Sequence, residues 1–128
     1  MSKRFRILMS IPAILVSCGI FYISHQTNPH MPDLGFDFGD KILHAFAYFV
    51  YGISLIMFLR ANFRKISRNQ IFLTVLIFGI LFGLSDEYHQ SFIPGRMAGI
   101  DDWIADTVGI MISLLLINPI KRASGTNN

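Results

Sequence analysis

The fold class is decided by the stretch ILHAFAYFVYGISLIMFL at residues 42–59. It contains no Asp, Glu, Lys or Arg, and at roughly 1.5 Å per residue a helix of this length crosses most of a hydrocarbon core of about 30 Å. Similar apolar segments occupy residues 7–24, 71–90 and 103–120. We therefore predict an all-α fold, a bundle of four transmembrane helices that forms a single integral membrane domain over residues 1–128.

The composition agrees with a membrane protein. The chain has 128 residues, 52% of them hydrophobic and only 15% charged, and its mean hydropathy is +0.50. Its pI near 9.3 does not indicate nucleic-acid binding, because the basic residues form short clusters beside the apolar segments and are not interleaved with aromatic residues. We expect membrane lipid as a partner and no nucleic acid.

The distribution of basic residues predicts the orientation. Nine of the 11 Lys and Arg residues lie in the N-terminus, the loop between the second and third segments, and the C-terminus: Lys3, Arg4, Arg6, Arg60, Arg64, Lys65, Arg68, Lys121 and Arg122. Basic loops stay in the cytoplasm, so we predict a multi-pass membrane protein with both termini cytoplasmic. All acidic and histidine residues then belong to the opposite face, or to helix ends that open toward it.

Three of the four segments carry a stripe of polar or small residues at helical spacing. The stripes are Asp40, His44, Ala47 and Tyr51 with Tyr48 beside them, then Gly79, Gly83, Asp86 and Gln90, then Asp102, Asp106, Gly109 and Ser113. Acidic side chains that face lipid are costly. We therefore expect the three stripes to face one another and to form a polar cluster at the extracytoplasmic end.

Four short motifs within residues 40–109 carry a family resemblance. They are Asp40-Lys41-x-x-His44-x-x-x-Tyr48, Ser85-Asp86-Glu87-x-x-Gln90, Pro94-Gly95-Arg96 and Asp102-x-x-Ala105-Asp106-x-x-Gly109. Together they resemble the VanZ-like family of small bacterial membrane proteins. The resemblance implies a protein of the bacterial inner membrane with a role at the cell envelope, since the family's named member is associated with reduced susceptibility to glycopeptide antibiotics of the teicoplanin type. Many relatives carry Asn at the position of Asp106, so the resemblance does not imply a required charge there.

The candidate site residues fall into two groups. A catalytic interpretation would use His44 with Asp86 or Glu87 as a general base. The candidate ligand-binding residues are Asp40, Lys41, Tyr48, Gln90, Arg96, Asp102 and Asp106. Lys41 and Arg96 would hold an anionic group, so the expected ligand is an anionic or peptidic envelope intermediate.

Several alternatives stay open at this point. No metal-binding motif is present and we predict no cofactor, although a divalent cation is an alternative, for which a carboxylate-rich set favours Mg²⁺, Mn²⁺ or Ca²⁺ over Zn²⁺. Catalysis is likewise undecided. The leading hypothesis is that the protein binds or modifies an envelope component at the outer leaflet. The alternative is a non-catalytic membrane scaffold or assembly partner whose polar cluster holds the helices together.

Overall fold

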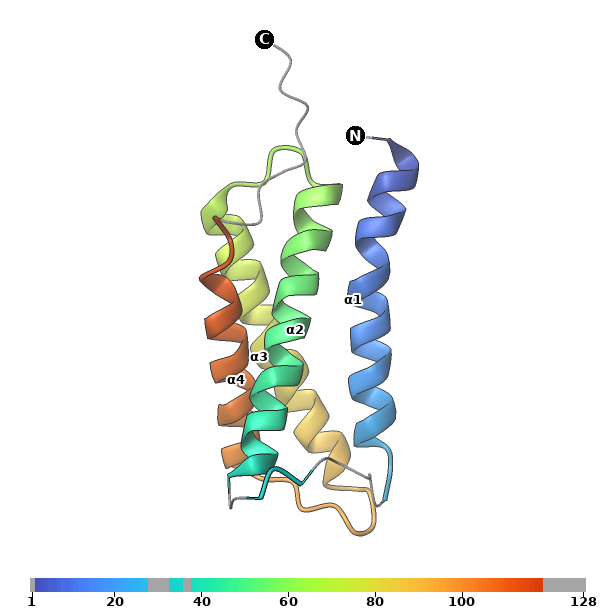
Figure 1. Ribbon diagram of the computed structural model, residues 1–128, viewed down its shortest axis with the longest axis vertical. Helices are drawn as coiled ribbons and strands as arrows, with labels where there is room; N and C mark the ends of the chain where they lie inside the picture. The colour runs from blue at the N-terminus through green and yellow to red at the C-terminus, as the bar shows by residue number, and fades with distance from the viewer. Residues whose placement is uncertain (1, 28–32, 36–37, 119–128) are drawn as a thin grey trace.

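The computed structural model describes residues 2–27, 33–35 and 38–118. These residues form four helices and no strand: α1 (Lys3–Ser24), α2 (Gly39–Asn62), α3 (Arg68–Gln90) and α4 (Ile100–Leu114). Figure 1 shows the helices running alternately up and down the long axis of the molecule. The predicted all-α, four-helix fold is confirmed. Four residues of the sequence argument, His30, Asp37, Lys121 and Arg122, lie outside the described residues.

The helix bounds differ from the predicted spans mainly at α4. The first three helices have 22, 24 and 23 residues, and each is long and apolar enough to cross a membrane. Helix α4 has 15 residues and ends at Leu114, and residues 115–118 form turns. Because Pro119 cannot donate a hydrogen bond to the carbonyl of Leu115, a helix is not favoured there. The predicted helical span is therefore wrong for residues 115–118, while residues 119 and 120 lie outside the described part of the chain.

Close backbone contact holds α2 against α4. A Cβ atom placed on Gly109 would lie 2.9 Å from the carbonyl carbon of Ala45 and 2.9 Å from the backbone nitrogen of Phe49. Gly79 of α3 similarly faces the side chain of Ile110, whose Cδ1 atom would be 2.6 Å from an added Cβ. Small residues at these positions let helices approach without an intervening side chain, as is common in membrane bundles. This packing places the polar stripes of three helices face to face.

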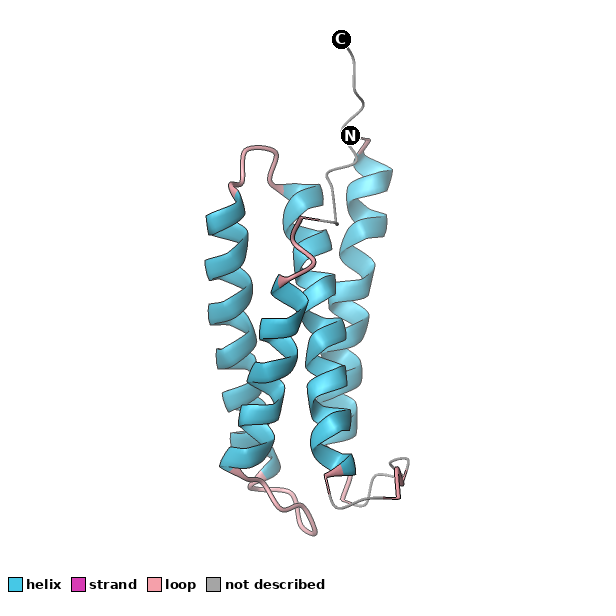
Figure 2. Cartoon of the chain, turned by 60° about the vertical axis from the view of Figure 1, so that its left-hand side comes forward, coloured by secondary structure: helices cyan, strands magenta, loops and turns pink. Residues whose placement is uncertain are grey.

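Helix α1 stands at the side of the bundle, as Figure 1 shows. It packs mainly on α2, contacts α3 over a small area, and does not contact α4 within the described residues. Large apolar side chains such as Leu8, Ile14 and Leu15 remain exposed along it. Figure 2 shows the connecting loops gathered at the two ends of the helices. An exposed apolar surface between two looped ends suits a bundle surrounded by lipid.

Candidate functional site

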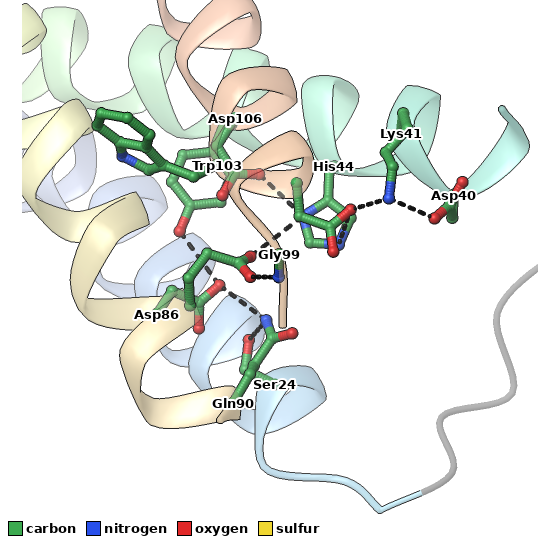
Figure 3. Close-up of polar contacts among 12 residues, drawn as sticks. Ser24, Asp40, Lys41, His44, Asp86, Gln90, Gly99, Trp103 and Asp106 are labelled. Atoms are coloured by element: carbon green, nitrogen blue, oxygen red, sulfur yellow. Dashed lines mark hydrogen bonds and ion pairs between the residues drawn. The ribbon is translucent and has the colours of Figure 1, made fainter. Parts of the chain in front are cut away.

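The polar residues gather at one end of the bundle, where α1 and α3 end and α2 and α4 begin (Figures 1 and 3). At the end of α3, the side chains of Asp86, Glu87 and Gln90 are buried. In the first turns of α4, Asp102 and Asp106 are buried as well. The three predicted stripes therefore meet, and the expected polar cluster is present at that end.

His44 occupies the centre of this cluster. Its Nδ1 atom lies 2.9 Å from Oδ1 of Asp106 and 4.0 Å from Oε1 of Glu87, and its Nε2 atom lies 3.9 Å from Oδ1 of Asp102. These carboxylates come from α3 and α4, whereas His44 belongs to α2. Figure 3 shows a dashed line between His44 and Asp106. The arrangement orients the ring through a carboxylate, as a general base or a metal ligand requires.

Two buried carboxylate oxygens in the cluster have no hydrogen-bond partner. Glu87 is 7% exposed and Asp106 is 1% exposed. The Oε2 atom of Glu87 accepts the backbone N–H of Gly99 at 3.1 Å, but Oε1 of Glu87 and Oδ2 of Asp106 remain unpaired. An unpaired buried carboxylate oxygen is costly, at least about 1–3 kcal/mol, so its presence in a folded protein calls for an explanation.

Lys41 pairs with carboxylates of two helices. Its Nζ atom lies 2.8 Å from Oδ2 of Asp40 and 2.9 Å from Oδ2 of Asp101, and it also contacts Oδ1 of Asp102. Asp101 is exposed and was not among the predicted site residues, because it lies beside the stripe of α4 and not on it. This ion-pair group joins the start of α2 to the start of α4 at the rim of the cluster.

A second chain of hydrogen bonds passes through Gln90. The amide nitrogen of Gln90 donates to Oδ2 of Asp86 at 3.4 Å and to Oγ of Ser24 at 3.2 Å, and the hydroxyl of Tyr48 donates to the same oxygen of Asp86 at 3.2 Å. Arg96 donates to Oε1 of Gln90 at 2.9 Å. Ser24 was missed from the sequence, since it carries no charge and lies on α1, which has no polar stripe.

A cavity of about 340 Å³ opens beside these groups. Its polar lining consists of Ser24, Thr27, Asp40, His44, Tyr48, Asp86, Gln90, Arg96 and Asp102. Its apolar lining includes Ile20 and Ile23 of α1, with Leu43 and Ala47 of α2. A cavity that joins a charged floor to an apolar wall can hold a molecule with a polar head and an apolar tail.

The structure brings all ten predicted site residues to this one end of the bundle, where they occupy different positions relative to the cavity. Seven of them line the cavity: Asp40, His44, Tyr48, Asp86, Gln90, Arg96 and Asp102. Of the other three, Glu87 and Asp106 lie next to His44, and Lys41 forms ion pairs with three carboxylates. Their catalytic or ligand-binding roles stay predictions.

Comparison with known proteins gives a family for this chain. Residues 3–121 match the family described as VanZ/LLP1. A curated relative, an uncharacterized protein of Schizosaccharomyces pombe, is 31% identical over 85 residues, which are 66% of this chain and 50% of that protein. The chain thus spans about half the length of this relative. No solved structure matches the chain.

Proposed function

Because the chain belongs to the VanZ/LLP1 family, we propose that it binds, and in a further step modifies, a cell-envelope component at the outer leaflet of a bacterial inner membrane. Both termini would be cytoplasmic, and the bound component would be one whose availability alters susceptibility to glycopeptide antibiotics of the teicoplanin type. The chain also has a relative in the yeast Schizosaccharomyces pombe.

The single observation that carries this proposal is the mixed lining of the cavity. Arg96 and His44 offer donors to a polar head group, while Ile20 and Ile23 form an apolar wall on α1. Helix α1 packs only lightly against α3, so this wall lies next to the lipid-exposed side of the bundle. These features support an amphiphilic ligand, whose head occupies the polar floor and whose tail follows α1.

The proposed modification step would use His44 as the general base. His44 is held by Asp106 at 2.9 Å, which is the orientation that a general base needs. A purely structural cluster is the second candidate, and the observation that favours it is the ion-pair group in which Lys41 joins α2 to α4. The two functions differ in what a conservative substitution does, because a scaffold tolerates changes that keep size and hydrogen bonding.

The test uses His44→Gln, Glu87→Gln and Arg96→Lys, each expressed in a strain in which the protein confers glycopeptide tolerance. Each should abolish the tolerance while the amount of protein in the membrane stays normal. Arg64→Lys is the matched control, since Arg64 is exposed at the opposite end of the bundle. Retained tolerance in all three variants, or a loss that only follows protein abundance, would leave the scaffold as the better function.

A further inference from the structure

Three side chains from three helices present potential metal ligands to one another. The Nδ1 atom of His44 and one carboxylate oxygen each of Glu87 and Asp106 all lie within 4.8 Å of one another. Nitrogen and oxygen ligands lie about 2.0–2.2 Å from a transition-metal ion, so neighbouring ligand atoms are roughly 3–3.5 Å apart. The 2.9 Å and 4.0 Å distances from His44 to the two carboxylates bracket that spacing. A modest inward movement of Glu87 completes the triangle.

The two unpaired carboxylate oxygens are a second indication, independent of the spacing, that these carboxylates bind a further group. Glu87 is anchored through Oε2 by the backbone N–H of Gly99, and this leaves Oε1, buried and unpaired, on the side of His44. Oδ1 of Asp106 lies 2.9 Å from Nδ1 of His44, where an ion would replace the proton that the two atoms otherwise share, and Oδ2 of Asp106 is buried and unpaired. Hydrogen-bonded outer contacts of this kind orient the ligands in metal sites.

The charges around the triangle also favour a cation. Lys41 is engaged by Asp40, Asp101 and Asp102, and Arg96 donates to the amide of Gln90. Neither of these cations has a contact with Glu87 or Asp106 in the structure as described. Within the part of the chain that the structure describes, His44 is thus the only basic side chain that faces the two carboxylates, and Asp86 and Asp102 add further negative charge nearby. A bound divalent cation would balance this excess.

We propose that His44, Glu87 and Asp106 bind a divalent cation of the Mn²⁺ or Zn²⁺ type. Imidazole is a ligand for transition metals, whereas Mg²⁺ and Ca²⁺ prefer a set made of oxygens alone, so a triangle with one His among three ligands favours a transition metal over Mg²⁺ or Ca²⁺. His44 also lines the cavity. The ion therefore lies at the cavity floor, with its remaining coordination positions available to a bound molecule.

The ion adds positive charge to a cavity whose lining is mainly negative. Among the described residues, three carboxylates but only one Lys or Arg side chain, that of Arg96, line the cavity. An anionic head group is repelled by such a lining unless a cation bridges it. The bridging role rests on the proposed function, whereas metal binding by the three side chains does not.

The experiment measures metal binding by the purified full chain in detergent micelles. After treatment with a chelator and dialysis, Mn²⁺ is titrated and the signal of free aqueous Mn²⁺ is followed by electron paramagnetic resonance. We expect one saturable site per chain, from which equimolar Zn²⁺ but not Mg²⁺ displaces Mn²⁺. Glu87→Gln and Asp106→Asn should each weaken binding at least about tenfold, since even losing an outer contact costs about 10- to 100-fold.

The control is Asp33→Asn, which removes an exposed carboxylate that is not one of the three proposed ligands and should leave the affinity unchanged. Equal binding by all variants, or the absence of a saturable site in the unchanged protein, overturns the proposal. If the site variants fail to fold, the Tm of the unchanged protein is compared with and without Mn²⁺. A bound ion must raise this Tm, so an equal Tm overturns the proposal. No antibiotic phenotype is measured in these experiments, so a failure of the proposed function leaves their result unaffected. A failure of metal binding likewise leaves the test of the proposed function unaffected.

Discussion

The contact between α2 and α4 at Gly109 offers the sharpest test of how the site is assembled. In Gly109→Ala, the added Cβ atom would lie 2.9 Å from the carbonyl carbon of Ala45 and closer still to its oxygen. Carbon atoms in ordinary contact are about 3.5–4.0 Å apart. The two helices would have to separate by roughly 1 Å at this point, since backbone atoms cannot rotate away as a side chain can.

The magnitude follows from two opposing effects. Overpacking costs about 1–3 kcal/mol, and a backbone clash belongs at the upper end of that range. Ala in place of a helical Gly returns about 1 kcal/mol of helix propensity. We therefore expect a net loss of about 2 kcal/mol. His44 precedes Ala45, so the same movement lengthens its 2.9 Å contact with Asp106 beyond hydrogen-bonding distance.

The assay is reversible unfolding of the purified protein in mixed detergent micelles, followed by circular dichroism. Gly19→Ala is the matched control, because Gly19 lies in α1 and nothing is within 4 Å of a Cβ added there. The free energy of unfolding of Gly19→Ala should equal that of the unchanged protein or exceed it by up to about 1 kcal/mol. If Gly109→Ala proves as stable as Gly19→Ala, the argument that backbone contact at Gly109 sets the spacing of the site is refuted.

Two further predictions concern orientation and helix packing. In a Cys18→Ser background, a cysteine placed at Asn62 should resist an impermeant thiol reagent applied to intact cells and one at Ala98 should react, because basic loops stay in the cytoplasm; labelling of the cysteine at Asn62 would reverse the orientation. Trp103→Phe should destabilise the protein by about 0.5–1.5 kcal/mol in the same unfolding assay, since the indole N–H donates to the carbonyl oxygen of Ile80 at 3.1 Å and joins α4 to α3. An unchanged stability would show that this hydrogen bond contributes nothing.

The helices and the membership of the polar cluster could be predicted from the sequence. The apolar segment at residues 42–59 predicts a transmembrane helix without reference to the rest of the chain, because its length and composition match the hydrocarbon core of a membrane. The i, i+4 spacing of Asp40 with His44, and of Asp102 with Asp106, puts each pair on one helix face without knowledge of any neighbour. These are local properties of the chain, and the structure agrees with them.

The partners of each side chain were decided by tertiary structure alone. Lys41 and Arg96 were expected to hold an anionic group, but in the structure Arg96 donates to Gln90 and Lys41 pairs with Asp40, Asp101 and Asp102. Glu87 lies off the stripe of α3, yet the backbone N–H of Gly99 draws its side chain inward. Such choices depend on helix rotation and separation, and on the loop conformations that bring backbone groups near a side chain.

The grouping of the three potential metal ligands was likewise decided by tertiary structure. Spacing along a helix relates residues three or four positions apart, but His44, Glu87 and Asp106 belong to three different helices, so no sequence motif records their distance. Their separation is set by how closely the helices pack, which depends on small residues such as Gly109 and Gly79. The sequence by itself therefore determined which residues reach the polar end of the bundle, and only the packing of the helices decided which atoms meet there.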